Sequence, residues 1–372
     1  MVRRDVIDRF LRMTKSEPVT IVTGPRKSGK TILCSESFPN RERLDLERTE
    51  TRAAAENDPR AFLARISDGA ILEGIQRCPD LVPCLKEAVE QVPAPGRWIL
   101  NGSPAPPIEG FAEPIILLPL TYNEEILFRK HPESLDDVMF TGSCPRIAAK
   151  HYPPGKWYGT YLSGYLERDV REITNVSDLD TFQRFMETCA AMAAGPLNLS
   201  ALAGDCGVSQ PTAKKWLSVL ERTFLAFRLS SYQGGRRRTM KMPKLHFYDT
   251  GLLCWLLGIR SPGELADHPL REFVFTTWVV SEIVKNRVHR GENGGVFHYR
   301  DRQGVEADAV VEHGDARSVV RADAGAEVSK DDDAPGDVGE PLVVYGGDED
   351  VIQSGTTFVS WRNIHERTWT AS

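Results

Sequence analysis

The feature that most constrains the fold of this chain is the sequence GPRKSGKT at residues 24–31. It fits the pattern G-x-x-x-x-G-K-[ST], a glycine-rich loop whose backbone N–H groups converge on a phosphate because no Cβ is in the way. The apolar run VTIVT at 19–23 predicts a buried strand before the loop. The residues from Thr31 onward predict a helix whose amino end adds a positive dipole. Strand, loop and helix in this order predict a phosphate site in an α/β fold.

The loop supplies the residues that we expect to hold ATP and Mg²⁺. Lys30 is expected to reach the β- and γ-phosphates, and the Thr31 hydroxyl is expected to hold the metal. The competing interpretation, a glycine-rich turn with a surface lysine, does not account for the flanking strand and helix. The residues expected to contact the nucleotide are Gly24, Pro25, Arg26, Lys27, Ser28, Gly29, Lys30, Thr31 and Ile32.

Composition narrows the class of protein around this loop. The chain has 372 residues, 41% of them hydrophobic, which favours two or three domains with cores of their own. No stretch is long and apolar enough to span a membrane, and the first residues, MVRRDVIDRFLRM, predict an amphipathic helix rather than a signal peptide. The seven cysteines form no C-x-x-C pair, which fits a reducing cytoplasm without disulfides or zinc. The net charge of −6 leaves nucleic-acid contact to a local basic patch.

Residues 18–120 alternate strand and helix patterns, which predicts a parallel sheet between two layers of helices. The apolar run that ends in Glu73 predicts a strand whose acid supports Mg²⁺, and we expect this strand beside the P-loop strand. The next position, where a carboxylate usually activates water, is Gly74. A later strand ends in polar residues, and Asn101 or Ser103 is a candidate sensor residue there.

Residues 121–195 have helical patterns throughout. Their most charged piece is YLSGYLERDVR at 161–171, in which Glu167 and Arg171 are four residues apart. This spacing favours a solvated helix face with an ion pair. The alternative gives Arg168 or Arg171 a role at a phosphate or across a subunit boundary.

Residues 197–232 fit a helix-turn-helix, in which Ser209 caps the second helix and Pro211 lies in its first turn. An apolar strand pattern and a basic turn follow, as in a winged helix. Such units also serve as packing or oligomerisation modules, so DNA contact is one of two open interpretations. The side chains expected to face DNA are Gln210, Thr212, Lys214, Lys215, Arg236, Arg237 and Arg238.

Residues 243–372 predict a small α/β domain. A helix is expected after Asp249, and a strongly apolar one is expected over 273–282. A Gly-, Asp- and Pro-rich stretch at 331–341 predicts a loop. Short strands are expected at 296–301, 307–311, 318–321, 341–345 and 357–361.

Eight stretches together resemble one family along nearly the whole chain. They are GPRKSGKT (24–31), ILEGIQRCPDL (71–81), RWILNGS (97–103), YLERDVRE (165–172), LERTFL (220–225), PKLHFYDTGLL (243–253), REFVFTTWVVSE (271–282) and YRDRQGVEADAVVE (299–312). The chain resembles bacterial AAA-type ATP-binding proteins that end in a domain of unknown function related to restriction endonucleases. The resemblance implies a P-loop ATPase core, a helical lid, a winged helix and a nuclease-like α/β domain. Their expected spans are 1–120, 121–195, 196–242 and 243–372.

Two departures from this family bear on ATP hydrolysis. The family usually carries Asp-Glu where this chain has Glu73 and Gly74, so the carboxylate that activates water is missing. The family also carries Ser-Leu-Ala-Gly-Arg where this chain has EGFAE at 109–113, which places an acid where an arginine is expected. Losing a transition-state arginine can cost about 10³–10⁵ in turnover. The resemblance therefore implies ATP–Mg²⁺ binding with weak or lost hydrolysis, unless Glu124, Glu125 or another carboxylate substitutes.

The terminal domain departs from a working nuclease as well. Such a nuclease needs a helix Glu, a strand Asp and a Glu-x-Lys triplet, which hold a metal and steady the attacking water. Glu282 and Asp308 match the first two. The triplet aligns with residues 321–323, Arg-Ala-Asp, which inverts both charges, and EVSK at 327–330 is one residue too long to replace it. We therefore expect Glu282 and Asp308 to be vestiges of a nuclease site.

Three functions stay open at this point. The first is an ATP-binding protein that uses the nucleotide as a structural or switching ligand. The second is a DNA-binding regulatory or defence component in which the nucleotide controls assembly. The third, an active nuclease, is the least supported because of the inverted charges. The expected ligands are ATP and Mg²⁺, and the open partners are DNA, another protein or a second copy of the chain, with no membrane.

Overall fold

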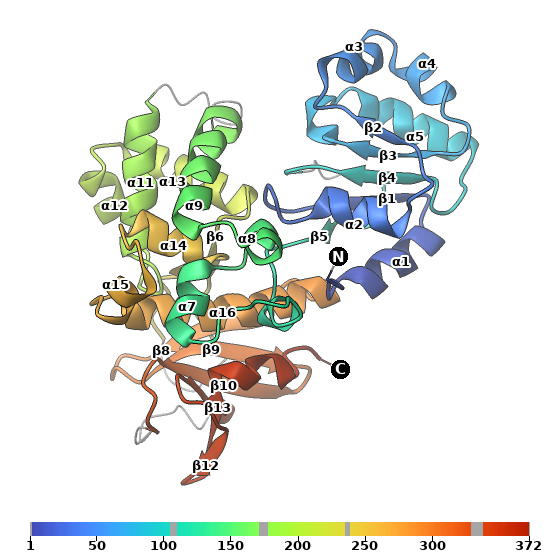
Figure 1. Cartoon of the computed structure of the whole chain (residues 1–372). Coiled ribbons are helices and arrows are strands. Elements are labelled where there is room, and N and C mark those ends of the chain that lie inside the picture. The colour runs from blue at the N-terminus through green and yellow to red at the C-terminus, as the bar shows by residue number, and fades with distance from the viewer. Residues whose placement is uncertain (1, 105–109, 171–177, 235–238, 329–337, 372) are drawn as a thin grey trace. The chain divides into compact units, whose positions relative to one another are not determined.

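The computed structural model describes residues 2–104, 110–170, 178–234, 239–328 and 338–371, without the side chains of residues 168 and 169. The chain forms two compact units (Figure 1). We call residues 1–118 with 289–291 the amino-terminal unit, and residues 119–288 with 292–372 the carboxy-terminal unit. The four-domain division expected from the sequence stays a prediction.

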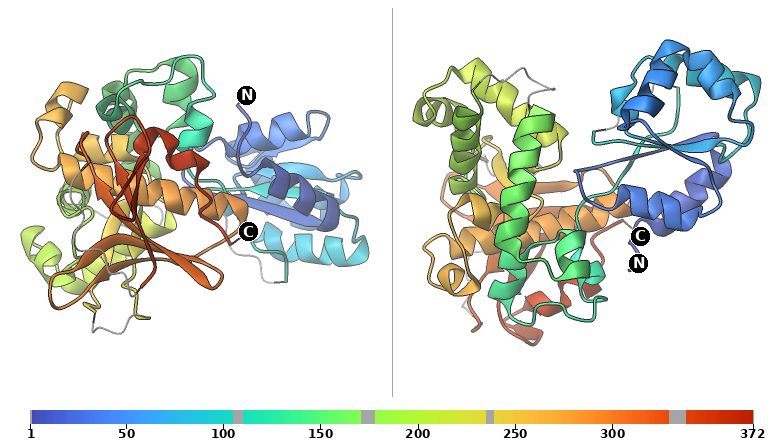
Figure 2. Two further views of the ribbon diagram at one scale, coloured as in Figure 1. Left: turned by 90° about the horizontal axis from the view of Figure 1, so that it is seen from below. Right: turned by 45° about the horizontal axis from the view of Figure 1, so that its top comes forward.

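The amino-terminal unit is built on a five-stranded sheet whose strands are all parallel, in the order β2-β3-β4-β1-β5. The strands are β1 (Val19–Thr23), β2 (Arg43–Asp45), β3 (Ala70–Glu73), β4 (Trp98–Asn101) and β5 (Ile115–Ile116). The helices are α1 (Ile7–Ser16), α2 (Lys30–Ser37), α3 (Thr49–Asn57), α4 (Pro59–Ala64), the short η1 (Ile75–Arg77) and α5 (Leu81–Gln91). Helices lie on both sides of this sheet (Figure 2).

The side chains of each strand point alternately to the two faces of the sheet, and both faces are covered by helices. On one face, Ile21 and Leu72 pack with side chains of α3, α4 and α5 in one core. On the other face, Val22 and Ile71 pack with Phe10 of α1 and side chains of α2. Successive side chains of a strand point to opposite faces, so a strand whose residues are all buried, such as β1, must be covered on both faces. The expected parallel sheet between two helical layers is confirmed.

The strand order of this unit differs from expectation. Strand β4 lies between β1 and β3, so the prediction that the strand of Glu73 neighbours the P-loop strand was wrong. In a parallel sheet the crossover connections set the order of the strands, and sequence adjacency does not.

The carboxy-terminal unit begins with helices, as expected for residues 121–195. They share one hydrophobic core with the helices that follow, in which Phe182 and Phe185 pack against the Trp216 ring at centroid distances of 5.2 and 5.4 Å. The helices before the helix-turn-helix region are α6 (Tyr122–Glu125), α7 (Leu135–Thr141), α8 (Pro145–Lys150), α9 (Pro154–Tyr165), η2 (Leu166–Val170) and α11 (Leu179–Ala191).

The helix-turn-helix region consists of α12 (Leu199–Asp205) and α13 (Gln210–Arg222), joined by a turn in which Gly207 has φ 68°. The Ser209 hydroxyl accepts the N–H of Thr212 at 3.2 Å, which caps α13 as its sequence predicts. Strands β6 (Ala226–Leu229) and β7 (Lys244–Phe247) follow and pair in antiparallel fashion. The winged-helix interpretation stays a prediction.

The last part of the chain is a six-stranded mixed sheet in the order β12-β13-β11-β10-β9-β8. Its core continues into the long helix α16, whose Val280 and Ile283 belong to one cluster with Val311 and Val320 of the sheet. The remaining helices are α14 (Thr250–Leu256), α15 (Pro262–Ala266), α16 (Arg271–Arg290) and η3 (Trp361–Glu366). The strands are β8 (Val296–Arg300), β9 (Glu306–His313), β10 (Ala316–Asp323), β11 (Glu340–Tyr345), β12 (Val351–Gln353) and β13 (Thr356–Ser360). Within the described ranges, no helix combines the length and the apolar character needed to cross a bilayer.

Candidate nucleotide-binding site

The loop at residues 24–31 joins the end of β1 to the first turn of α2. Gly24 has φ 145°, and a Cβ there would lie 2.2 Å from the Leu117 carbonyl oxygen. Gly29 has φ 103° and directly precedes α2. These two conformations favour glycine, so the motif's glycines are required by the backbone as well as by a ligand.

Lys30 lies across this loop. Its ammonium donates to the carbonyl oxygens of Gly24 at 3.0 Å and Pro25 at 2.7 Å, and only 7% of the residue is exposed. The lysine is thus held at the loop by backbone oxygens. A bound phosphate would provide acceptor oxygens for the Lys30 ammonium that carry more negative charge than these carbonyl oxygens.

Thr31 and Glu73 are brought together as expected. The Thr31 hydroxyl donates to Glu73 Oε2 at 3.0 Å. The other carboxylate oxygen, Oε1, accepts from Nε and Nη2 of Arg43 at 3.0 and 2.8 Å. Hydroxyl and carboxylate oxygens are ligands that Mg²⁺ prefers, so this pair can hold the metal. The sequence did not indicate Arg43, because its contact depends on β2 pairing with β3.

The end of β4 adds two polar residues. Asn101 is 4% exposed, and its amide nitrogen has no hydrogen-bond partner among the described residues. The buried hydroxyl of Ser28, in the loop itself, also lacks a partner there. Burying such groups unpaired is costly, so two orphaned donors at one loop fit a ligand with many acceptor oxygens. Ser103 lies past the strand end, and its N–H donates to the Gln76 side chain at 3.4 Å.

Arg4 supports the loop and was not indicated by the sequence. Its guanidinium donates to the carbonyl oxygens of Ser28 at 2.7 Å and Leu118 at 2.8 Å, and the residue is 4% exposed. Arg4 thus ties the segment before α1 to the loop and to the end of β5. No local pattern identifies such a residue, since both acceptors are backbone atoms far away in the sequence.

The remaining loop residues lie around this site. Arg26 of the loop forms an ion pair of 3.7 Å with Glu47, which follows β2. Lys27 adopts φ 65°, unusual for a residue with a side chain. Ile32, in the first turn of α2, leaves 47% of its surface exposed, although it is a large apolar residue.

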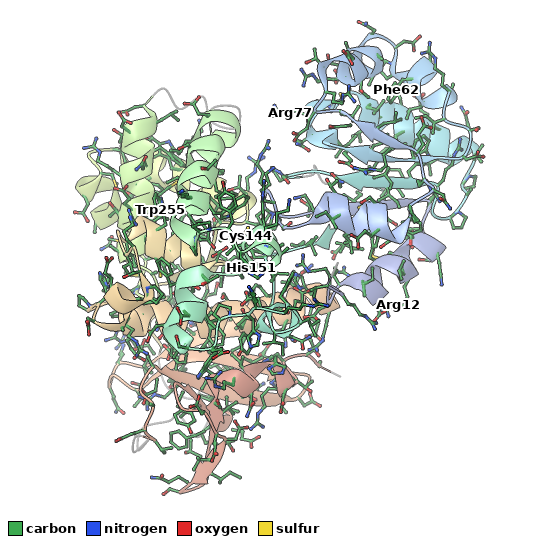
Figure 3. The ribbon with its side chains drawn as sticks, viewed as in Figure 1. Arg12, Phe62, Arg77, Cys144, His151 and Trp255 are labelled. Atoms are coloured by element: carbon green, nitrogen blue, oxygen red, sulfur yellow. The ribbon has the colours of Figure 1, made fainter. Side chains whose placement is uncertain are left out.

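The carboxylates that were expected as substitute bases belong to the carboxy-terminal unit. Glu124 accepts the N–H of Thr121 at 2.9 Å in a capping box at the start of α6. Glu125 is buried, and burial raises the pKa of its carboxyl well above the ordinary value. Glu125 lines a cavity of about 310 Å³ together with His151. His151, which follows the last residue of α8, is labelled in Figure 3.

The residues expected to face DNA are described in part. Gln210, Lys214 and Lys215 are exposed on α13, whereas Thr212 is half-buried and its hydroxyl bonds to Ser209 at 2.8 Å. Arg236, Arg237 and Arg238 lie outside the described residues, as do Arg171 and the side chain of Arg168.

The expected vestiges of a nuclease site have separate partners. Glu282 on α16 accepts the N–H of Tyr122 at 2.7 Å and pairs with Lys285. Asp308 on β9 accepts the N–H of Ala322 at 3.0 Å. No hydrogen bond or ion pair joins Glu282 to Asp308 within the described part of the chain. Their grouping as a former metal site stays a prediction.

A lysine takes part in the surroundings of Asp308. The Lys244 ammonium lies 2.5 Å from Glu306 and 3.4 Å from Asp308, and the lysine is 3% exposed. Glu272 lies in the first turn of α16. Burial is the largest cause that raises the pKa of its carboxyl, and the negative charges of Asp323 and Asp308 raise this pKa further.

Comparison with known proteins agrees with this geometry. Residues 16–116 match the family described as an AAA domain, and residues 132–263 match a domain of unknown function. Uncharacterized proteins of Mycobacterium bovis and Mycobacterium tuberculosis are each 27% identical over 321 residues, which cover 83% of this chain and 71% of theirs. The Walker-type ATPase of Pyrococcus abyssi aligns with 69% of this chain and 96% of its own, at 12% identity and a TM-score of 0.46.

The family match and the geometry concern the same residues. The AAA match spans the whole parallel sheet from β1 to β5, and the phosphate loop lies at the start of that span. Lys30 and Thr31 lie at this loop, and the Thr31 hydroxyl contacts Glu73. Residues 16–116 are thus similar to an AAA domain, and their parallel sheet and glycine-rich loop are consistent with a P-loop ATPase core.

Proposed function

We propose that the amino-terminal unit binds ATP with Mg²⁺ and hydrolyses it slowly or not at all, so that the nucleotide acts as a structural or switching ligand. The observation that carries the proposal is the 3.0 Å hydrogen bond between Thr31 and Glu73 beside the loop that holds Lys30. It places a hydroxyl and a carboxylate together at the amino end of α2, next to the expected phosphate position.

The residues present fit this ligand. Loop N–H groups, the Lys30 ammonium and the orphaned donors of Ser28 and Asn101 would bind phosphate oxygens. Thr31 and Glu73 would hold the metal, which when bound neutralises charge on the β- and γ-phosphates. Ile32, half-exposed beside the loop, would offer an apolar contact to the nucleoside.

Slow hydrolysis follows from what the site lacks. Position 74 is a glycine with φ 74°, a conformation that a glutamate would adopt only with strain. The segment where the family carries an arginine ends in the exposed acid Glu113. A missing base costs about 10²–10⁴ in rate and a missing arginine about 10³–10⁵.

Calorimetry tests the binding, and a phosphate-release assay on the same preparation tests the turnover. ATP and a non-hydrolysable analogue should bind with similar affinity in the presence of Mg²⁺. Lys30→Ala should weaken both at least tenfold, whereas Lys15→Ala, an exposed lysine on α1, should not. No binding at millimolar ATP would refute the proposal, and robust turnover abolished by Lys30→Ala would refute its slow-hydrolysis part.

A second candidate function is a DNA-binding regulatory or defence component in which nucleotide controls assembly. It is supported by the exposure of Gln210, Lys214 and Lys215 on α13, the second helix of the helix-turn-helix. A mobility-shift titration at two salt concentrations tests it, because phosphate contacts make binding weaken as salt rises. Changing both lysines to alanine should then reduce the slope of the logarithm of the binding constant against the logarithm of the salt concentration by about two. Equal binding by the double variant, or none by the parent protein, excludes α13 as the contact.

A further inference from the structure

The position of the missing carboxylate is occupied by another residue. Gly74 follows β3, and its N–H donates to the Asn101 carbonyl oxygen at 2.9 Å. A Cβ on this glycine would lie 2.9 Å from Cγ of Glu47, closer than real Cβ atoms approach their neighbours. The side chain of Glu47 therefore fills the space that a side chain at position 74 would need.

Local structure fixes Glu47 at this point. The N–H of Leu46 donates to the Glu73 carbonyl oxygen at 2.8 Å, which extends the pairing of β2 with β3 beyond the last paired residues. The N–H of Glu47 then donates to Oδ1 of Asp45 at 2.9 Å, and α3 begins two residues later. The backbone of Glu47 is thus held beside the carboxyl ends of both strands, where ligands bind in open parallel sheets.

The carboxylate of Glu47 faces the phosphate loop and remains accessible. Its Oε1 lies 3.7 Å from Nη2 of Arg26, the third residue of GPRKSGKT. The Glu47 side chain is 44% exposed, so water can reach it. The ion pair is only partly exposed, since 15% of the Arg26 side chain is accessible, and at 3.7 Å it is longer than a hydrogen bond. Its position between the loop and the end of β3 is therefore the feature that needs a functional explanation.

We propose that Glu47 replaces the carboxylate missing at position 74 and acts as the base for the residual hydrolysis of ATP. This inference rests on the proposed function, since it requires nucleotide at the loop. Water attacks the γ-phosphorus and its proton passes to the Glu47 carboxylate, while the bond from phosphorus to the bridging oxygen breaks. The products are ADP and inorganic phosphate, and Glu47 returns its proton to solvent.

The competing explanation is that Glu47 only positions Arg26. Both explanations predict damage when Glu47 becomes alanine, because the ion pair is lost in either case. Glu47→Gln separates them, since its amide oxygen can still accept from Arg26 but cannot take a proton at neutral pH. Glu50→Gln is the matched control: Glu50 lies on α3, three residues further on, and pairs with Arg48 at 3.6 Å at a largely exposed position.

Three measurements on the 372-residue chain test the proposal. They are the dissociation constant of ATP by calorimetry, the single-turnover rate of phosphate release, and the affinity for ADP with aluminium fluoride, which imitates the transferred phosphoryl group. Glu47→Gln should leave ATP affinity within twofold. It should lower the single-turnover rate about 10²-fold or more and weaken the aluminium fluoride complex at least tenfold. Glu50→Gln should change none of the three.

Each outcome has one meaning. If Glu47→Gln hydrolyses ATP as fast as the parent protein, or if the parent binds ATP with no measurable turnover, Glu47 is not the base, and the nucleotide-binding proposal stands. If the parent protein does not bind ATP, both proposals fail. If Glu47→Gln loses ATP affinity and rate in equal measure, the residue acts through Arg26, and the proposal of a base is refuted.

Discussion

The Thr31 hydroxyl donates to the Glu73 carboxylate at 3.0 Å, which joins the first turn of α2 to the end of β3. Two oxygens of the types that Mg²⁺ prefers thus lie within hydrogen-bond distance before any ligand arrives. We therefore expect the effect of Mg²⁺ on nucleotide affinity to depend on Thr31 and Glu73 more than on the other residues of the loop.

Glu73→Gln should reduce the dependence of ATP binding on Mg²⁺. Parent protein should lose at least tenfold in affinity when EDTA replaces Mg²⁺, and the variant should lose threefold or less, because its amide is a poor metal ligand. Titration calorimetry under both conditions measures this. The control is Glu87→Gln, an exposed glutamate of α5 paired with Arg60. An unchanged metal dependence in Glu73→Gln would place the metal elsewhere.

Arg4→Ala should destabilise the amino-terminal unit by about 1–3 kcal/mol, because the buried carbonyl oxygens of Ser28 and Leu118 lose their charged donor. It should also weaken ATP binding, since the loop loses its support. Denaturant unfolding and calorimetry measure the two effects. Arg3→Ala, at an exposed pair with Asp8, should stay within 0.5 kcal/mol, on the order expected for surface substitutions. A similar loss in both variants would count against a specific role for Arg4.

Gly24→Ala should abolish ATP binding and lower stability by several kcal/mol. Its added Cβ would lie 2.2 Å from the Leu117 carbonyl oxygen, and φ is 145°. Gly164→Ala, on α9 with open space around its Cα, should instead stabilise the chain by about 0.5–1 kcal/mol. Thermal unfolding with and without ATP compares the two. Normal nucleotide binding by Gly24→Ala would show that the loop adopts another conformation in solution.

Glu125→Gln should make stability less dependent on pH. Burial raises the pKa of Glu125 well above 4.5, Glu282, Asp249 and Glu124 raise it further, and Lys285 opposes them. The native state therefore holds its proton more tightly than the unfolded state, so the parent protein loses stability as pH rises above about 4.5. Glu125→Gln imitates the protonated form. Its free energy of unfolding should therefore rise relative to that of the parent protein by up to about 1.4 kcal/mol for each pH unit above 4.5. Urea unfolding at pH 5 and pH 7 measures this, and an equal difference at both values would contradict it.

Lys244→Met should cost about 3 kcal/mol, because it leaves Glu306 and Asp308 without the ammonium that lies 2.5 and 3.4 Å from them. Adding Asp308→Asn should recover part of that loss, since one unpaired charge is then removed. Denaturant unfolding of the single and double variants completes the cycle. Equal stability of Lys244→Met and the parent protein would mean that solvent screens this group.

The sequence predicted those parts of the site that are local. GPRKSGKT placed Lys30 and Thr31 correctly at the start of a helix, and the apolar run before Glu73 placed that acid at a strand end. The alternation of strand and helix patterns over residues 18–120 predicted a parallel sheet between two helical layers. These inferences depend on residues within about one turn or one strand of each other.

The parts that could not be predicted depend on distant pairings. Strand β4 enters between β1 and β3 because of how crossovers run, and no residue of β3 encodes that neighbour. Arg43 and Glu47 reach the site only because β2 pairs with β3. Glu282 shows the converse: its residue type fitted a nuclease, but Tyr122 and Lys285 engage its carboxylate.

The ion pair between Arg43 and Glu73 affects how a metal ion can bind to the Glu73 carboxylate. The Arg43 guanidinium balances the charge of the Glu73 carboxylate within the protein. A metal ion that binds Glu73 has to share the carboxylate with Arg43 or displace Arg43 toward solvent. The Arg43 side chain is already 46% exposed. Binding and release of the metal at Glu73 would then move Arg43. Because Arg43 lies at the surface, a neighbouring molecule could detect this movement.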